Sequence, residues 1–297
     1  MGQVGLRQDG DPLFRLSDGS LEPGGRQSTY TLGAMMSPEV YAAAGLTVGV
    51  LIGVTGIGGG SIMTPILVFV FGQSPTVAVG TDLLFASATK VAATISLGLS
   101  RRVDWKIMAR LAAGSLPAAF LVVGWMWSTH RPAVEVDRLT LHALAVMLVC
   151  TGAVLLAYSR IQRLGLRVTT ATRARIERWQ PAATVVCGVL LGLAVALTSV
   201  GAGALGTVAL LFLYPLRLTA DRLVATDIAH ALPLTLVAGL GHAALGHVDW
   251  IILGSLLLGS IPGVLIGTRF AIRFPEAVVR SLIAVMLLAS GMRMLIG

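Results

Sequence analysis

The sequence contains little charge for its length. Charged residues make up 12% of its 297 residues, whereas hydrophobic residues make up 55%. A soluble domain carries about 25% charged residues, so this chain cannot cover a water-facing surface of its size with polar groups. The shortage of charge excludes most soluble enzymes and nucleic-acid-binding proteins. The composition is typical of an integral membrane protein.

Cysteines and catalytic motifs are also scarce. The two cysteines, Cys150 and Cys187, lie in apolar segments without C-x2-C spacing, which excludes a disulfide framework and any familiar metal-binding pattern. The sequence lacks H-E-x-x-H and G-x-S-x-G, so a protease or esterase is disfavoured, and it lacks the G-x4-G-K-[ST] motif that binds ATP. We therefore expect no enzymatic activity, no bound metal and no cofactor.

Apolar segments long enough to cross a bilayer, which takes about 17–25 residues, recur along most of the chain. The candidate spans are 40–57, 76–99, 106–127, 139–158, 182–200, 220–243, 250–268 and 277–296. Two shorter apolar stretches, 59–72 and 203–216, each follow a glycine-rich break. Residues 1–36 are polar and glycine-rich, which predicts a disordered tail. The fold class that we predict is an all-α integral membrane protein.

The membrane region repeats itself at an offset of 145 residues. Val103-Asp104-Trp105 recurs as Val248-Asp249-Trp250, Thr81-Asp82 as Thr226-Asp227, and Gly114-Ser115 as Gly259-Ser260. An ungapped offset across several motifs is unlikely to arise by chance. We predict two homologous membrane repeats, 37–160 and 181–297, joined by a basic cytoplasmic loop at 161–180.

The positions of the arginines predict that the two repeats insert in opposite directions. If only the eight long segments crossed the bilayer, five arginines of the second repeat would lie outside, against the positive-inside rule. These arginines are Arg217, Arg222, Arg269, Arg273 and Arg280. Counting the short stretches as crossings gives five per repeat, and the arginines become cytoplasmic. We predict an inverted repeat with about four spans plus one short glycine-headed helix in each half, and leave open whether that helix crosses or re-enters.

Each repeat interrupts an apolar run with glycines. The residues that we expect to bind substrate at these breaks are Gly58, Gly59, Gly60 and Ser61 in the first repeat, and Ser199, Gly201 and Gly203 in the second. A helix that begins after a break directs free N–H groups and its positive dipole end at the gap, which favours an anion. Broken helices in inverted repeats are typical of secondary transporters. The alternative is that the glycines only permit close helix packing.

Ionisable residues inside apolar runs usually mark a transport pathway. Lys90 is a candidate partner for an anionic substrate, and Thr81 and Thr226 are candidate hydroxyl ligands. We predict that Asp82, Asp227 and His230 serve in proton coupling, His230 because its pKa range suits that role. The alternatives are helix capping by the aspartates, snorkelling by Lys90 and simple packing of His230. Asp104 and Asp249 are expected to cap helices at the interfaces.

These motifs together resemble the TauE/SafE sulfite exporter family, over about residues 40–297. The resemblance is carried by the break at Thr55 to Gly60, the A-V-G-T motif at Ala78 to Thr81, the V-D-W motif and the repetition of all three. It implies transport of sulfite, sulfate or organosulfonates across the bacterial inner membrane. Family members typically have Gly-Thr-Ser where this chain has Gly80-Thr81-Asp82, and the second break is a degenerate Gly201-Ala202-Gly203-Ala204.

The sequence therefore predicts a secondary transporter that moves a small sulfur-containing anion by alternating access. A passive anion channel and a transporter of another small oxyanion are the alternatives. The partners that we expect are the small anion and the lipid bilayer, and no nucleic acid. The sequence leaves open whether the chain forms a homo-oligomer.

Overall fold

The computed structural model describes residues 37–55, 60–96, 102–129, 132–165, 170–214, 218–270 and 276–296. These ranges hold ten α-helices and no strand. The helices are α2 (Pro38–Thr55), α3 (Gly60–Phe69), α4 (Pro75–Ser96), α5 (Trp105–Ser128), α6 (Ala133–Gly165), α7 (Thr170–Thr198), α8 (Ala204–Leu213), α9 (Ala220–Ala244), α10 (Trp250–Phe270) and α11 (Glu276–Ile296). The predicted disordered tail, 1–36, lies outside the described residues.

Seven of the described helices are long and apolar enough to cross a membrane, namely α4, α5, α6, α7, α9, α10 and α11. The predicted all-helical membrane architecture is confirmed at this level. Shorter apolar helices are α2 and α8, and α3 also has only ten residues. The basic segment 161–180 is largely helical rather than a loop, because α6 continues to Gly165 and α7 begins at Thr170. The division into two repeats at this segment stays a prediction.

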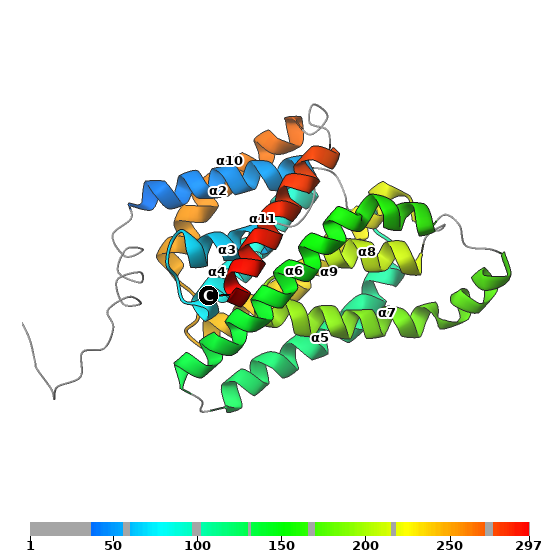
Figure 1. The fold of residues 1–297 in the computed structure, drawn as a ribbon, viewed down its shortest axis with the longest axis horizontal. Coiled ribbons are helices and arrows are strands. Elements are labelled where there is room, and N and C mark those ends of the chain that lie inside the picture. Colours follow the sequence, from blue (N-terminus) through cyan, green and yellow to red (C-terminus); the bar gives the residue numbers. More distant parts are fainter. Residues whose placement is uncertain are drawn as a thin grey trace, which may run out of the picture.

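Helices far apart in the sequence lie side by side. α2 packs along α10, α5 packs along α7, and α6 packs against α11. Figure 1 shows the α2/α10 pair and the α5/α7 pair on opposite sides of the molecule. The central helices α4 and α9 pack against each other. The protein buries 67% of the apolar stretch of α4 and 61% of that of α9, against 33–50% in the other five spans. A polar side chain on α4 or α9 is therefore the most shielded from lipid and water.

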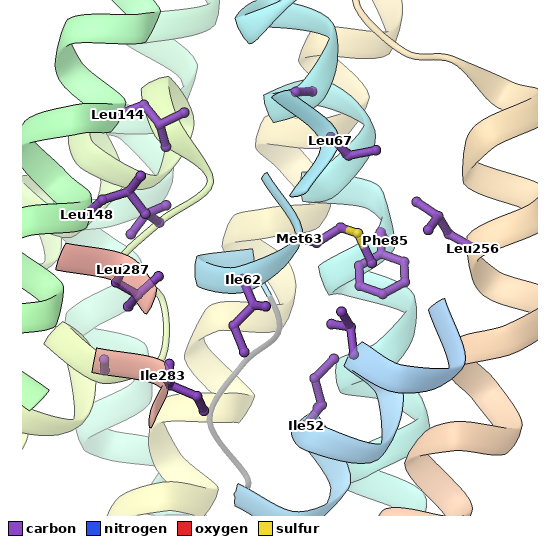
Figure 2. Close-up of a cluster of buried hydrophobic side chains, with 14 of the residues drawn as sticks. Ile52, Ile62, Met63, Leu67, Phe85, Leu144, Leu148, Leu256, Ile283 and Leu287 are labelled. Carbon is purple, nitrogen blue, oxygen red and sulfur yellow. The ribbon is translucent and has the colours of Figure 1, made fainter. Parts of the chain in front are cut away.

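The short helix α3 is built into the largest buried hydrophobic cluster. Figure 2 shows Met63 and Leu67 of α3 beside Phe85 of α4, with Leu144 and Leu287 on the side of α6 and α11. Burying apolar surface in this way fixes the position of α3 without requiring that it cross the bilayer. The cluster therefore places α3, from Ile62 to Leu67, inside the helix bundle.

Glycines allow α2 and α10 to approach closely. Those on α2 face the backbone of α10, and those on α10 face α2; they are Gly45, Gly49, Gly53, Gly259, Gly263 and Gly267. A Cβ added at Gly263 would lie 3.1 Å from the Val50 nitrogen and 3.2 Å from the Gly49 Cα. Small residues every fourth position are a familiar means of helix association in membranes. For these glycines, close packing is the structural role.

The same packing occurs twice in the molecule. Gly45 faces Leu256 across the α2/α10 interface, and Gly188 faces Leu111 across the α7/α5 interface. Leu111 and Leu256 are 145 residues apart, the offset of the sequence repeat. Gly45 and Gly188 are 143 residues apart, so the leucine side of each contact lies at the repeat offset and the glycine side is shifted by two residues.

The glycine contact predicts an asymmetry between two positions on α10. Gly263→Leu should lower the free energy of unfolding by about 3 kcal/mol, the upper end of typical overpacking costs, because its side chain meets backbone atoms of α2. The matched control is Gly254→Leu, because a Cβ at Gly254 has no atom within 4 Å. The midpoint of thermal unfolding in detergent measures both; equal midpoints for the two variants would contradict the packing role.

Candidate functional site

The buried ionisable residues gather on the two central helices. Asp82 and Lys90 lie on α4, and Asp227 and His230 lie on α9. Their exposed fractions are 0%, 2%, 2% and 1%, so all four are shielded by protein. Charges inside a membrane protein are costly and are usually retained for function. The sequence prediction that these four residues lie within the helix bundle agrees with their burial, while their roles stay predictions.

Each aspartate is bound to the short helix that follows the break in its own half. Thr64 of α3 donates a hydrogen bond to Asp82 Oδ2, and Thr207 of α8 donates to Asp227 Oδ2 at 3.0 Å. The second carboxylate oxygen, Oδ1, has no hydrogen-bond partner among the described residues in either case. Each carboxylate therefore keeps one free acceptor inside the bundle.

Gly206 makes room for the Asp227 carboxylate beside the first turn of α8. A Cβ at Gly206 would collide with Asp227 Oδ1 and would lie 3.0 Å from its Cγ. Any larger residue would push the carboxylate away from α8. Sequence reasoning missed Gly206, because nothing in the local pattern shows that an aspartate of the following helix reaches this position.

The alternative in which the two aspartates cap helices is wrong. Asp82 and Asp227 are each the eighth residue of a helix, since α4 begins at Pro75 and α9 at Ala220. Their carboxylates point at neighbouring helices rather than at the amides of their own first turn. The residues that cap are Asp104 and Asp249, which accept hydrogen bonds from the N–H groups of Ile107 and Ile252. For the V-D-W motif, the predicted capping role is confirmed.

Lys90 is buried without a hydrogen bond on its ammonium group among the described residues. It lies within electrostatic range of both Asp82 and Asp227. The alternative of snorkelling to the interface is wrong, because a snorkelling lysine would expose its ammonium group to water. A lysine that faces two carboxylates and has unused donors can bind an anion or exchange partners.

His230 extends the polar cluster toward α5. Its Nε2 lies 2.8 Å from the Ser115 hydroxyl oxygen, and its Nδ1 has no partner among the described residues. Asp227 and His230 are three residues apart on α9, but they form no hydrogen bond with each other in this conformation. His230 instead joins α9 to α5 through a polar contact.

The break in the second half is present as predicted. α7 ends at Thr198 and α8 begins at Ala204, and φ is positive at Ser199 (59°), Gly201 (111°) and Gly203 (149°). The backbone amides of Gly201, Ala202 and Gly203 donate to no described residue, although all three residues are buried. Buried amides without partners are rare and costly in a membrane interior. The segment is therefore a set of unused donors beside the polar cluster.

The Ser199 side chain connects this break to Asp82. Its hydroxyl is buried and lies near the Asp82 carboxylate without a hydrogen-bond partner among the described residues. The unwound segment of the second half thus reaches the charged residues of the first. In the first half, Gly58 and Gly59 lie outside the described residues, and Gly60 and Ser61 form the start of α3.

Thr81 and Thr226 hold the two halves together by a reciprocal pair of hydrogen bonds. Thr81 Oγ1 accepts from the backbone N–H of Asp249, and Thr226 Oγ1 accepts from that of Asp104, both at 3.0 Å. The Thr226 hydroxyl also donates to the Arg222 carbonyl oxygen at 2.6 Å. In this conformation the only O–H donor of Thr226 is already used, so its predicted donation to an anionic substrate needs a rearrangement. The two repeated motifs are V-G/A-T, at 79–81 and 224–226, and V-D-W; each copy of the first contacts the copy of the second in the other half.

A second polar group, which the sequence analysis did not single out, lies at the other end of α9. His242 is fully buried, its Nε2 lies 2.9 Å from the Ala196 carbonyl oxygen, and its ring centroid lies 5.7 Å from that of His247. His247 lies in the connection to α10, where burial lowers the pKa of its imidazole and Asp137 partly opposes that shift. His242 therefore ties α9 to α7, and His247 packs beside it.

A bundle of membrane-length helices, with ionisable residues on its two central members and an interrupted helix beside them, defines a multi-pass membrane transporter. The model of the family "Sulfite exporter TauE/SafE" matches residues 41–294. The chain belongs to this family, and the resemblance seen in its motifs is confirmed.

Curated relatives agree with this assignment. The chain is 38% identical over 261 residues to "Probable membrane transporter protein YjnA" of Bacillus subtilis (strain 168), covering 84% of this chain and 97% of the relative. It is 26% identical over 238 residues to a "Probable membrane transporter protein" of Xylella fastidiosa (strain 9a5c), covering 79% and 85%. No solved structure matches the chain. The protein is a membrane transporter and not an enzyme.

The reciprocal hydrogen bonds predict a stability effect at Thr226. Thr226→Val removes the acceptor of the buried Asp104 N–H and should lower the free energy of unfolding by about 1–3 kcal/mol, the cost of an unsatisfied buried donor. Thr226→Ser keeps the hydroxyl and is the matched control. Thermal unfolding of the purified protein measures both. A Thr226→Val variant with full stability but no transport would assign the residue to substrate binding alone.

Proposed function

We propose that this transporter moves a small sulfur-containing anion, such as sulfite, sulfate or an organosulfonate, across the bacterial inner membrane by alternating access. The observation that carries the proposal is the unwound Ser199–Gly203 segment, whose buried amides have no described partner and which faces the same carboxylate as Lys90. Backbone amides and an ammonium group are the donors that bind oxyanions in proteins. The choice of a sulfur oxyanion rests on the family.

Alternating access needs two elements that can rock against each other around a central site, and the proposal assigns this to an inverted repeat. Three observations support it. Five described helices precede the 166–169 connection and five follow it. α2/α10 and α5/α7 pack through similar contacts between a glycine and a leucine, in which Leu256 and Leu111 are separated by the repeat offset. The hydrogen bond between Thr81 and Asp249 matches that between Thr226 and Asp104 at the same offset. An odd number of crossings per half would insert the halves oppositely.

Within this proposal, the residues of the breaks supply backbone donors and Lys90 supplies charge. Gly58 to Ser61 would contribute from the first half, and Ser199 to Gly203 from the second. Thr81 and Thr226 would join when the crosswise hydrogen bonds to the V-D-W motifs open. Asp82, Asp227 and His230 are the candidate proton carriers, since they are the buried titratable groups nearest to Lys90 along α4 and α9.

Transport by purified protein in liposomes tests the proposal directly. Labelled sulfite and sulfate, with phosphate as another oxyanion, are offered under a pH gradient, a sodium gradient or neither. We expect at least one sulfur anion to accumulate above its external concentration under a gradient. Flux that only equilibrates would identify a passive channel, and movement of phosphate alone would identify a carrier of a different oxyanion.

Lys90 should be required for anion binding. Lys90→Gln should weaken the binding of the preferred sulfur anion by about tenfold to a hundredfold, the equivalent of one charge-assisted hydrogen bond. The control is Lys106→Gln, because Lys106 is an exposed lysine in the first turn of α5. The measurement is the rise in unfolding temperature with anion concentration, since a ligand stabilises the state that it binds. Equal anion-induced shifts in both variants would place the site elsewhere.

The inverted topology predicts that the two V-D-W motifs face opposite sides of the membrane. Trp105 and Trp250 occupy matching positions and are 61% and 63% exposed. Single cysteines replacing them, in a chain with Cys150 and Cys187 changed to serine, should react with a membrane-impermeant maleimide from opposite faces. Labelling of intact spheroplasts and of inverted vesicles gives the comparison. Labelling of both positions from one face would rule out inversion.

A further inference from the structure

We propose that Asp82 and Asp227 are internal substitutes for the transported anion, so that the anion binds only together with protons that these carboxylates take up. This inference rests on the proposed function, and it adds how binding is coupled to protons. It makes the transporter a proton–anion symporter in which one proton accompanies each negative charge of the substrate.

The carboxylates of Asp82 and Asp227 have similar surroundings. Each lies beside the short helix of its own half and accepts a hydrogen bond from a threonine there, Thr64 or Thr207. Asp227 Oδ1 also packs against Gly206 in the first turn of α8, where the partial positive charge of the helix is strongest. Each carboxylate thus occupies a position that would suit a bound oxyanion.

The two carboxylates share one buried cation, Lys90. Among the described residues, Lys90 is the only lysine or arginine that is fully buried, and it lies within electrostatic range of both aspartates. α3 and α8 contain no ionisable side chain in their sequences. His230 faces Ser115 of α5. The other titratable and charged groups with described side chains on the helices packed around α4 and α9, or at their caps, lie toward the helix ends; they include Glu39, Asp104, Lys106, Arg110, Glu135, Asp137, Arg138, His142, Asp221, Arg222, His242, Asp249 and Arg269.

The net charge of the site links anion binding to proton uptake. Two ionised aspartates and one lysine leave one net negative charge in a buried place, which repels an incoming anion. Protonation of a carboxylate removes one negative charge and weakens its hold on the threonine, the helix end and Lys90. These donors can then turn to the substrate. A monovalent anion with one proton, or a divalent anion with two, leaves the net charge of the site unchanged.

The constant charge has two consequences that the wild-type protein can test. Anion affinity should rise as the pH falls, by about tenfold per pH unit for each proton taken up. This holds over the pH range in which the two aspartates are ionised in the protein without bound anion. Transport should follow the pH gradient and be insensitive to the membrane potential, because the anion and its protons together carry no net charge. A carrier whose anion binds without protons would show no such rise of affinity at low pH.

The experiment uses anions whose own charge is constant between about pH 5.5 and 8, so that only the protein titrates. Sulfate and thiosulfate serve as divalent probes and methanesulfonate as a monovalent probe. Affinity is measured from the anion-induced rise in unfolding temperature at several pH values. Calorimetry in buffers of different ionisation enthalpy counts the protons taken up by the wild-type protein per bound anion. We expect one proton with methanesulfonate and two with a divalent anion.

Variants assign the protons to residues. Asp82→Asn and Asp227→Asn should each bind anions at high pH at least as tightly as wild type and lose one proton from the pH dependence, and the double variant should bind independently of pH. Asp221→Asn is the control, because Asp221 lies on α9 like Asp227 but its side chain is 67% exposed. It should keep the wild-type pH dependence.

The outcomes separate this inference from the function on which it rests. If none of the probes binds wild type at any pH and none is transported, the proposed function is overturned and the inference with it. If an anion binds wild type with no proton uptake, only the inference is overturned. If the pH dependence survives in the double variant, the protons belong to another group, and the inference is again overturned.

Discussion

The burial of two aspartates and one lysine is the constraint on which the rest of the structure depends. An unpaired charge taken out of water costs several kcal/mol, so the fold must provide partners for Asp82, Asp227 and Lys90 inside the bundle. It does so with Thr64 and Thr207, with the first turn of α8 and with the charges themselves. These partners come from α3, α4, α8 and α9, which lie in both halves of the chain. The charged site therefore requires that the two halves assemble around a common centre.

Close packing of the outer helices makes this assembly geometrically feasible. The glycines of α2 and α10, and those of α7 against α5, bring backbones together so that α4 and α9 can meet between the two pairs. Thr81 and Thr226 then fix the start of α10 and α5 from the opposite half. The break before α8 leaves donors unused at the centre, which stable packing alone would not retain. The structure thus combines rigid outer contacts with an unsatisfied interior, as expected of a protein that binds and releases a polar solute.

Much of this arrangement follows from the sequence, and the rest has a physical reason for being hidden. Apolar runs located the helices to within a few residues, because the bilayer requires long apolar spans. They underestimated the lengths of α6 and α7, because the basic residues that extend both helices give no apolar signal. The position of the Gly201–Gly203 break was visible because glycine disfavours helix. The capping interpretation of Asp82 failed because α4 starts two turns earlier, at Pro75. The contact of Thr81 with Asp249 joins residues 168 apart, and no local pattern encodes it.

The measurement that tests the account most directly is a structure at acidic pH with the preferred sulfur anion bound. The account predicts anion density within hydrogen-bond distance of the Lys90 ammonium group and of the amides between Ser199 and Ala204, with the Asp227 carboxylate no longer held by Thr207. Density for the anion at any other place, or a continuous helix through residues 198–204 with no polar space beside Lys90, would contradict it.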